Sequence, residues 1–177
     1  MNWMDYLPLL ALLTSLVSAA IIFSLRDDRV RTRTIVNLTG SGLKLALIGV
    51  MLWGVLDQQQ YEFHFPIMPG MEFVLRADSL AMFFVTLSGL LWFLTTIYAV
   101  AYLEGSRQRS RFFGFFSLCV SATVGLALAG NLFTFVIFYE LLTLATYPLV
   151  VHKETNEARR AGRIYLAYTL SGGVLLL

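Results

Sequence analysis

Long apolar runs separated by short polar segments make up most of this chain. The runs long enough to form membrane helices cover residues 6–25, 35–56, 80–103, 112–130 and 132–151. A spanning helix needs about 20 mostly apolar residues, because the hydrocarbon core is roughly 30 Å thick and each helical residue rises about 1.5 Å. The pattern therefore predicts five full transmembrane helices.

A sixth apolar run covers residues 164–177 and is shorter. As a helix it would rise only about 21 Å, which is less than the thickness of the core. Gly172 and Gly173 lie in this run and could permit a break. We expect a truncated sixth helix, so that residues 1–177 form a single transmembrane domain with an all-α, polytopic, integral membrane fold.

Composition agrees with this fold class. Hydrophobic residues make up 58% of the chain and charged residues 14%, and the mean hydropathy is +0.72, which is outside the usual range of soluble domains. The first apolar run follows no Lys or Arg, which argues against a cleaved signal peptide. The chain is predicted to be a multi-pass protein of a lipid bilayer.

Charge distribution predicts how the chain crosses the membrane. Eleven of the thirteen Lys and Arg residues lie in three alternate loops, at 26–33, 107–111 and 153–163. Positive charges in short loops mark the cytoplasmic side, so the N-terminus is predicted to lie outside. The basic clusters "RDDRVRTRT" and "RQRSR" are interpreted as topology signals, and no nucleic-acid partner is expected.

The 57–79 loop is the longest predicted outer connection. In "YEFHF" the aromatic residues alternate with Glu62 and His64, and "MEFVLR" follows after a turn that contains Pro69 and Gly70. This alternation predicts a short hairpin that caps the outer face. His152 is predicted to lie on the opposite side from His64, so the two histidines cannot share a metal.

The sequence contains no recognisable enzyme or cofactor motif. It has neither "GxxxxGK[ST]" nor a "GxGxxG" between a strand and a helix. Its single cysteine, Cys119, excludes an intrachain disulfide and a cysteine-based metal site. We therefore expect no enzyme activity, no cofactor and no metal in this chain.

Two ionisable residues interrupt the apolar runs, namely Lys44 and Glu140. Lys44 is ten residues from Thr34 and Glu140 eleven from Val151, at the same predicted face. Each is therefore roughly 15 to 17 Å deep at about 1.5 Å per residue. A charge at a helix centre costs about 2.5 to 3.5 kcal/mol on insertion scales and commonly marks an ion pathway.

These two residues also have purely structural interpretations. Glu140 could only hold helices together by bonding to Thr or Tyr hydroxyls, and Lys44 could extend its stem toward an interface. If their helices are neighbours, the two could instead form a charge pair. Pro148, near the end of the fifth run, removes a backbone donor and is predicted to bend the last turn.

Small residues four apart predict how the helices pack. One series consists of Ala11, Ser15 and Ala19, and a second of Ser121, Gly125 and Ala129. Such series let membrane helices approach closely. They indicate a packed bundle.

Three stretches of the chain resemble a known family. They are "LRADSLAMFFVTLSGLLWFLTTIYAVAYL", "RFFGFFSLCVSATVGLALAGNLFTFVIFYELLTLATYPLVV" and "EARRAGRIYLAYTLSGGVLLL". They are similar to the N-terminal part of antiporter-like proton-translocating subunits, which include complex I membrane-arm subunits, the A and D components of Mrp antiporters, and membrane-bound hydrogenase subunits. The run "NLFTFVIFYELLTL" is the most specific part.

The resemblance assigns expected roles to individual residues. Glu140 matches the family glutamate of the fifth helix, which pairs with a lysine on the seventh. Asp78, in "RADSL", matches a family aspartate with a structural or interfacial role. This chain has no lysine after Lys153, so the family lysine has no counterpart, and Lys44 is the candidate partner. The chain is then expected to be a fragment, a split subunit or a remnant, with the fragment favoured.

The resemblance therefore implies a proton or cation/proton translocating subunit, with Glu140 as the proton-exchanging group. Its expected partners are other membrane subunits of an antiporter or respiratory complex, together with protons, with sodium left open. Any redox chemistry would reside in the partner subunits. The expected location is the bacterial inner membrane. The alternative is a non-transporting scaffold or assembly subunit of such a complex.

Overall fold

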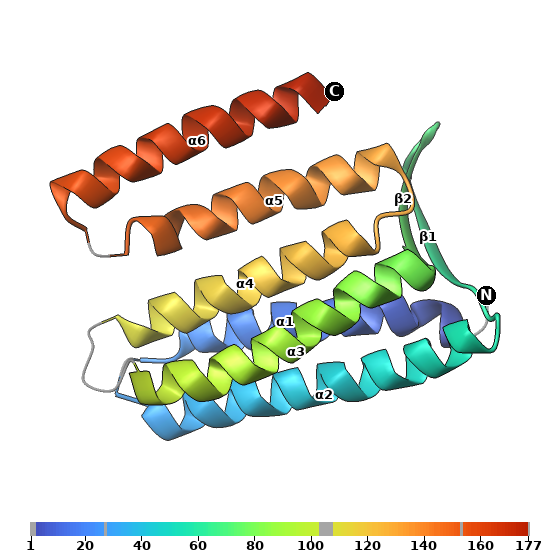
Figure 1. Cartoon of the computed structure of the whole chain (residues 1–177), viewed down its shortest axis with the longest axis horizontal. Coiled ribbons are helices and arrows are strands. Elements are labelled where there is room, and N and C mark those ends of the chain that lie inside the picture. Colours follow the sequence, from blue (N-terminus) through green and yellow to red (C-terminus); the bar gives the residue numbers. More distant parts are fainter. Residues whose placement is uncertain (1–2, 27, 103–107, 153, 177) are drawn as a thin grey trace.

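The fold is that of a computed structural model, which describes residues 3–26, 28–102, 108–152 and 154–176, without the side chain of residue 176. Within these ranges it contains one short 3-10 helix, six α-helices and two strands (Figure 1). These elements are η1 (Trp3–Tyr6), α1 (Leu7–Ser24), α2 (Val30–Leu56), β1 (Tyr61–Met68), β2 (Met71–Ala77), α3 (Ser79–Tyr102), α4 (Arg109–Ala127), α5 (Leu132–Val150) and α6 (Asn156–Leu176).

The all-α membrane fold is confirmed. Among the described residues, five helices are long and apolar enough to cross a membrane, and they are α1 to α5, with η1 included in the first span. The predicted helix ends at residues 103 and 177, and the cations Arg107 and Lys153, lie outside the described residues. The helix α2 begins at Val30, earlier than predicted, because its polar first turns contain no helix breaker.

The sixth helix differs from the prediction in two ways. It begins at Asn156 instead of residue 164, and it passes Gly172 and Gly173 without interruption. The polar segment before residue 164 contains Glu, Ala and Arg, which favour helix, and a hydropathy pattern does not register them. Thr155 caps this helix by accepting a hydrogen bond from the backbone N–H of Ala158 at 3.1 Å.

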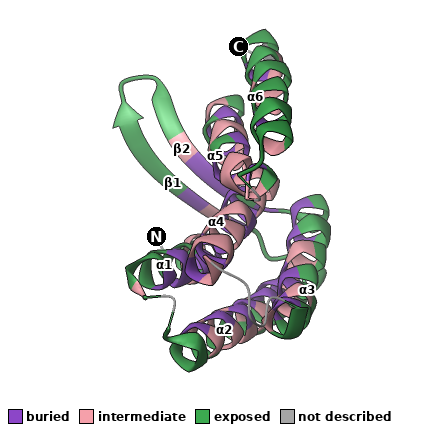
Figure 2. Cartoon of the chain, turned by 90° about the vertical axis from the view of Figure 1, so that its left-hand side faces the viewer, coloured by how far each residue is buried: buried purple, intermediate pink, exposed green. Residues whose placement is uncertain are grey.

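The predicted hairpin is also confirmed. The strands β1 and β2 pair antiparallel from Tyr61↔Ala77 to Met68↔Met71. Gly70 has a φ of 85°, a left-handed conformation that suits glycine in a tight turn. The base of the hairpin is buried and its tip is exposed (Figure 2).

Helices close in sequence pack side by side in an antiparallel bundle. The helix α1 packs against α2 and α4, α3 packs against α2, and α5 lies between α4 and α6. The α6 helix forms the outermost layer and is largely exposed (Figures 1 and 2). The small-residue series lie partly at these contacts, where the Ser121 hydroxyl donates to the Leu12 carbonyl at 3.2 Å.

The two ends of the bundle differ in chemistry. The described arginine-rich connections lie at the end opposite the hairpin (Figure 1). There Arg111, at the start of α4, forms a 2.7 Å ion pair with Glu154 of the α5–α6 connection. We call this the arginine end and the other the hairpin end.

The apolar core lies mainly in the half of the bundle near the hairpin end. Its cluster includes Leu7, Met51, Phe63, Leu75 and Met82. A second cluster, nearer the arginine end, is smaller and is built on Ile22, Ala99 and Phe113. Much of the remaining interior toward the arginine end is filled by polar side chains.

Candidate functional site

The start of α5 is fixed to the hairpin by two polar side chains. Asn131 is the N-cap of α5 and accepts from the Thr134 backbone N–H at 2.8 Å. Its side-chain N–H donates to the Glu72 carbonyl at 2.7 Å. The Thr134 hydroxyl accepts from the Val74 backbone N–H at 2.9 Å. These positioning residues were not predicted from the sequence, although an Asn directly before a helical run is a capping signal.

Backbone hydrogen bonds reinforce this attachment. Arg76 N–H donates to the Leu128 carbonyl at 2.7 Å, and Gly130 N–H donates to the Val74 carbonyl at 2.9 Å. A Cβ at Gly130 would approach Val74 too closely, so glycine lets the strand and the α4–α5 turn meet. The height of α5 in the bundle is therefore set at its first turn.

Glu140 lies in the middle of α5 and is half-buried. Its carboxylate faces α6, where a Cβ added to Gly173 would overlap Glu140 Oε1 and lie 3.1 Å from its carboxyl carbon. Among the described residues, no hydrogen bond or ion pair to this carboxylate was found. The glycine provides the room for a carboxylate between the two helices.

Tyr139, the preceding residue, links α5 to α6 by a polar bond. Its hydroxyl donates to the Thr169 carbonyl at 3.3 Å. A Cβ at Gly172 would lie 3.3 Å from the same hydroxyl. The hydrogen bond between these two helices therefore comes from the phenol, and the Glu140 carboxylate is not used for it.

Lys44 lies on the inner face of α2 with no exposed surface. Its ammonium donates to Ser15 Oγ of α1 at 2.7 Å. The same nitrogen lies 5.0 Å from the ring centroid of Trp92 on α3, within cation–π range. Lys44 thus points between three helices, away from any lipid-facing surface.

The structure does not bring Lys44 and Glu140 together. Lys44 is surrounded by α1, α2 and α3, whereas Glu140 faces α6. Among the described residues no ion pair joins the two. Their pairing, for which matched depth was the argument, stays a prediction.

The remaining predicted site residues lie at helix ends. Asp78 precedes α3, and its Oδ1 accepts from the Ala81 backbone N–H at 2.8 Å. Pro148 lies inside α5, which continues past it to Val150. No group of three or more His, Cys, Asp and Glu that could hold a metal was found among the described residues.

Outside the membrane spans, pairing with an arginine lowers the pKa of two carboxyl groups. The Arg76 guanidinium donates to Glu62 at 2.6 and 2.8 Å and holds the pKa of that carboxyl below its usual value. Nearby His64 adds to the effect, because it lies 3.4 Å from the same carboxylate. At the arginine end, the hydrogen bond from Arg111 lowers the pKa of Glu154.

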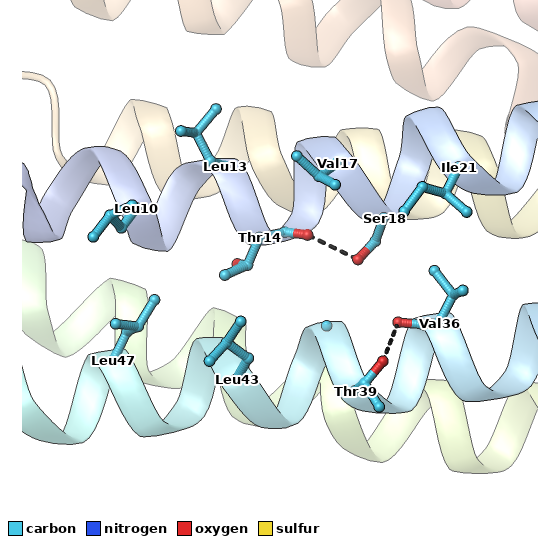
Figure 3. A pocket seen from close by; sticks show the side chains of 11 residues that line it. Leu10, Leu13, Thr14, Val17, Ser18, Ile21, Val36, Thr39, Leu43 and Leu47 are labelled. Carbon is cyan, nitrogen blue, oxygen red and sulfur yellow. Dashed lines mark hydrogen bonds between the residues drawn. The ribbon is translucent and has the colours of Figure 1, made fainter.

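A groove between α1 and α2 has a volume of about 510 Å³ (Figure 3). Leucine, isoleucine and valine side chains form most of its walls. Its polar groups bond within their own helices, since Ser18 donates to the Thr14 carbonyl and Thr39 to the Val36 carbonyl (Figure 3). Thr39 also donates to the Ile35 carbonyl. The groove therefore offers an apolar surface, without the free polar groups of an ion site.

In the described part of the chain, five helices of spanning length, with Lys44 and Glu140 midway along two of them, define the class as a polytopic α-helical membrane protein with ionisable side chains deep in its spans. Comparison with protein-family models gave no match. Curated relatives do match, and each is matched over only part of its own length.

One relative is the A/B component of a probable K(+)/H(+) antiporter of Rhizobium meliloti (strain 1021), 31% identical over 60% of this chain and 11% of the relative. Hydrogenase-4 component B of Escherichia coli (strain K12) is 29% identical over 62% of this chain and 17% of its own length. The chloroplastic NAD(P)H-quinone oxidoreductase subunit 5 of Chara vulgaris is 29% identical over 99% of this chain and 28% of its own length.

Two solved structures share the fold. A chain of the Mrp complex from Dietzia sp. DQ12-45-1b superposes with a TM-score of 0.80 at 20% identity, covering 98% of this chain and 33% of that one. A chain of the archaeal membrane-bound sulfane sulfur reductase gives 0.75 at 20% identity, covering 93% and 25%. The resemblance seen in the sequence is thus confirmed, and the chain spans a third or less of these relatives.

Proposed function

We propose that this chain is part of a proton or cation/proton translocating membrane subunit, in which Glu140 is the proton-exchanging group. Antiporter and respiratory-type subunits among the relatives support a membrane subunit that works with other membrane subunits. On this proposal the chain is not itself an enzyme, and any redox chemistry resides in its partners. The membrane would be a bacterial inner membrane.

The observation that carries the proposal is the position of the Glu140 carboxylate. It lies deep in an apolar helix without a hydrogen-bonding partner among the described residues, beside a glycine that leaves it room. An ionisable group placed within a membrane at a cost in free energy commonly belongs to an ion pathway. The alternative, a scaffold in which Glu140 ties helices together, is less well supported because Tyr139 makes the α5–α6 bond.

The test is Glu140→Gln in the intact assembly, assayed for proton uptake in membrane vesicles with and without a sodium or potassium gradient. We expect transport to be abolished while insertion and assembly remain normal, because the amide has nearly the same shape but cannot carry the proton. The cation dependence of the wild-type rate separates proton transport alone from cation/proton exchange.

Tyr139→Phe is the matched control. It removes the hydrogen bond to Thr169 from the adjacent position. We expect it to keep transport and to weaken the α5–α6 contact. Normal transport by Glu140→Gln, or its loss only in proportion to lost assembly, would favour the scaffold function.

A further inference from the structure

One face of α2 carries a line of buried polar side chains. Its members are Arg33, Asn37, Ser41 and Lys44, which recur every three or four residues and are at most 2% exposed. Residues at this spacing share one helix face. We call this line the α2 polar seam, and it runs from the arginine end to the depth of Lys44.

Neighbouring helices supply the seam with hydroxyl groups. Arg33 donates to Ser110 Oγ of α4 at 2.9 Å. Ser117 of α4 donates to Asn37 Oδ1 at 3.0 Å. With Ser15 beside Lys44, these contacts make the seam the polar interior between α1, α2 and α4.

The helix α3 packs over the seam, and its contacts with α2 show which residues of the two helices lie at the same depth. Gly89 of α3 meets Ile48 of α2, and Trp92 meets Gly40 and Lys44. Because α2 and α3 run antiparallel, one further turn along α3 places Thr96 level with the segment between Asn37 and Lys44. Trp92 and Thr96 are both fully buried, at 1% and 0% exposure.

Three buried polar atoms around the seam have no hydrogen-bonding partner among the residues that the structure describes. They are Asn37 Nδ2, Trp92 Nε1 and Thr96 Oγ1. The Lys44 ammonium has three N–H groups, and the hydrogen bond to Ser15 uses one of them. The seam is therefore rich in donors that lack acceptors, a condition that costs free energy unless an internal acceptor is present.

We propose that water molecules fill the α2 polar seam and connect Lys44 to the arginine end of the bundle. Water can supply the acceptors that these buried N–H and O–H donors lack, because its oxygen accepts from more than one donor. Buried water typically bonds to groups left unsatisfied by the protein. The chain of hydroxyl and amide groups from Arg33 to Lys44 gives such waters partners along the whole path. Toward the hairpin end the path stops at the apolar cluster of Ile48, Met51 and Met82.

This hydrated site is separate from the α1–α2 groove and from Glu140. A Cβ at Gly40 would overlap Ser18 Oγ and lie 3.4 Å from Trp92, so these three residues close the wall between the groove and the seam. Among described residues, no carboxylate lies within 4.0 Å of the Lys44 ammonium. The inference does not rest on the proposed function of Glu140.

Radiolytic labelling tests the proposal in the intact protein in its membrane. An X-ray pulse in ¹⁸O-enriched water forms hydroxyl radicals at internal waters, and mass spectrometry locates the oxidised residues. Trp92 is the reporter, while Met51 and Met82, each 0% exposed within the apolar cluster, are the dry references. Both residue types react readily with hydroxyl radicals. We expect Trp92 to be oxidised several-fold faster than either methionine.

Variants then test whether the oxidation of Trp92 depends on the polar side chains of the seam. Asn37→Leu should lower Trp92 oxidation several-fold, because it removes polar partners midway along the path. Thr39→Leu is the matched control, since Thr39 is exposed and its hydroxyl donates to carbonyls of its own helix. Glu140→Gln should leave the labelling unchanged, whether or not it abolishes transport.

Two results would overturn the proposal. One is oxidation of Trp92 in the unmodified protein at the rate of Met51 and Met82, which would show a dry seam and needs no variant to be folded. The other is equal Trp92 oxidation in Asn37→Leu and Thr39→Leu, which would show that the water at Trp92 does not arrive along the seam.

Discussion

At the scale of single residues, the environment of Glu140 depends on a glycine, Gly173, in the neighbouring helix. Gly173 leaves space on α6 that the carboxylate occupies, and a methyl group there would meet Glu140 Oε1. Because the carboxylate is the end of a flexible side chain, it would have to turn away. The glycine that the sequence offered as a possible helix break is thus part of the carboxylate's surroundings.

We predict that Gly173→Ala reduces transport by the intact assembly several-fold without affecting insertion. The added methyl group displaces the Glu140 carboxylate but preserves the helix, since alanine is a better helix former than glycine. Proton uptake in membrane vesicles measures the effect. Gly49→Ala, where the space is open, is the control, and an equal response of both variants would contradict a local role.

The pairing of Glu140 with another residue could not be predicted from the sequence. Depth follows from counting residues along a helix, and by this measure Lys44 and Glu140 match. Which helices are neighbours depends on tertiary packing, and the contacts place α2 beside α1 and α3 while α5 lies beside α4 and α6. A depth calculation has no information about this lateral arrangement.

At the scale of elements, hydropathy predicts the membrane spans because burial in lipid constrains about 20 consecutive residues at once. Hydropathy does not predict the start of a helix that begins in polar sequence, as in the first turns of α2 and α6. The alternation in "YEFHF" predicted the hairpin because β1 is buried on one side at its base. Its attachment to α5 involves residues far apart in sequence, which no local pattern reveals.

Asn131→Ala is predicted to destabilise the protein more than Thr155→Ala. Both lose a helix cap worth about 1 kcal/mol, but only Asn131 also bonds the hairpin at Glu72, a contact worth about another 1 kcal/mol. Unfolding in a detergent titration measures the difference. Equal losses would mean that the bond to the hairpin contributes nothing to stability.

The hairpin is predicted to lose stability in acid. The hydrogen bond from Arg76 lowers the pKa of Glu62 in the folded protein, so its stabilising effect is complete above the unfolded pKa and disappears as the pH falls through the folded one. Hydrogen exchange of the β1 and β2 amides, followed from neutral pH down through the carboxyl range, should show this loss of protection.

Glu62→Gln should remove much of this pH dependence. Glu72→Gln is its control, because it lies near His64 and leaves the Glu62–Arg76 pair intact. If protection falls equally with pH in both variants, another group is responsible.

At the scale of the whole molecule, the hairpin end and the arginine end are predicted to lie on opposite sides of the membrane, with the arginine end in the cytoplasm. Cysteine labelling checks this after Cys119→Ser, which removes the single cysteine. His64→Cys should react with an impermeant maleimide in right-side-out vesicles, whereas Thr155→Cys should react only in inverted ones. The reverse pattern would overturn the orientation.

The unequal chemistry of the two halves of the bundle has an electrical consequence. A hydrated, polar half is easily polarised and sustains little voltage, so the membrane potential would fall mainly across the apolar half between Lys44 and the hairpin end. The potential acts on a charge with about 2.3 kcal/mol per 100 mV over its full drop. A charge that crosses only this thin apolar layer would therefore experience most of the energy of the whole membrane.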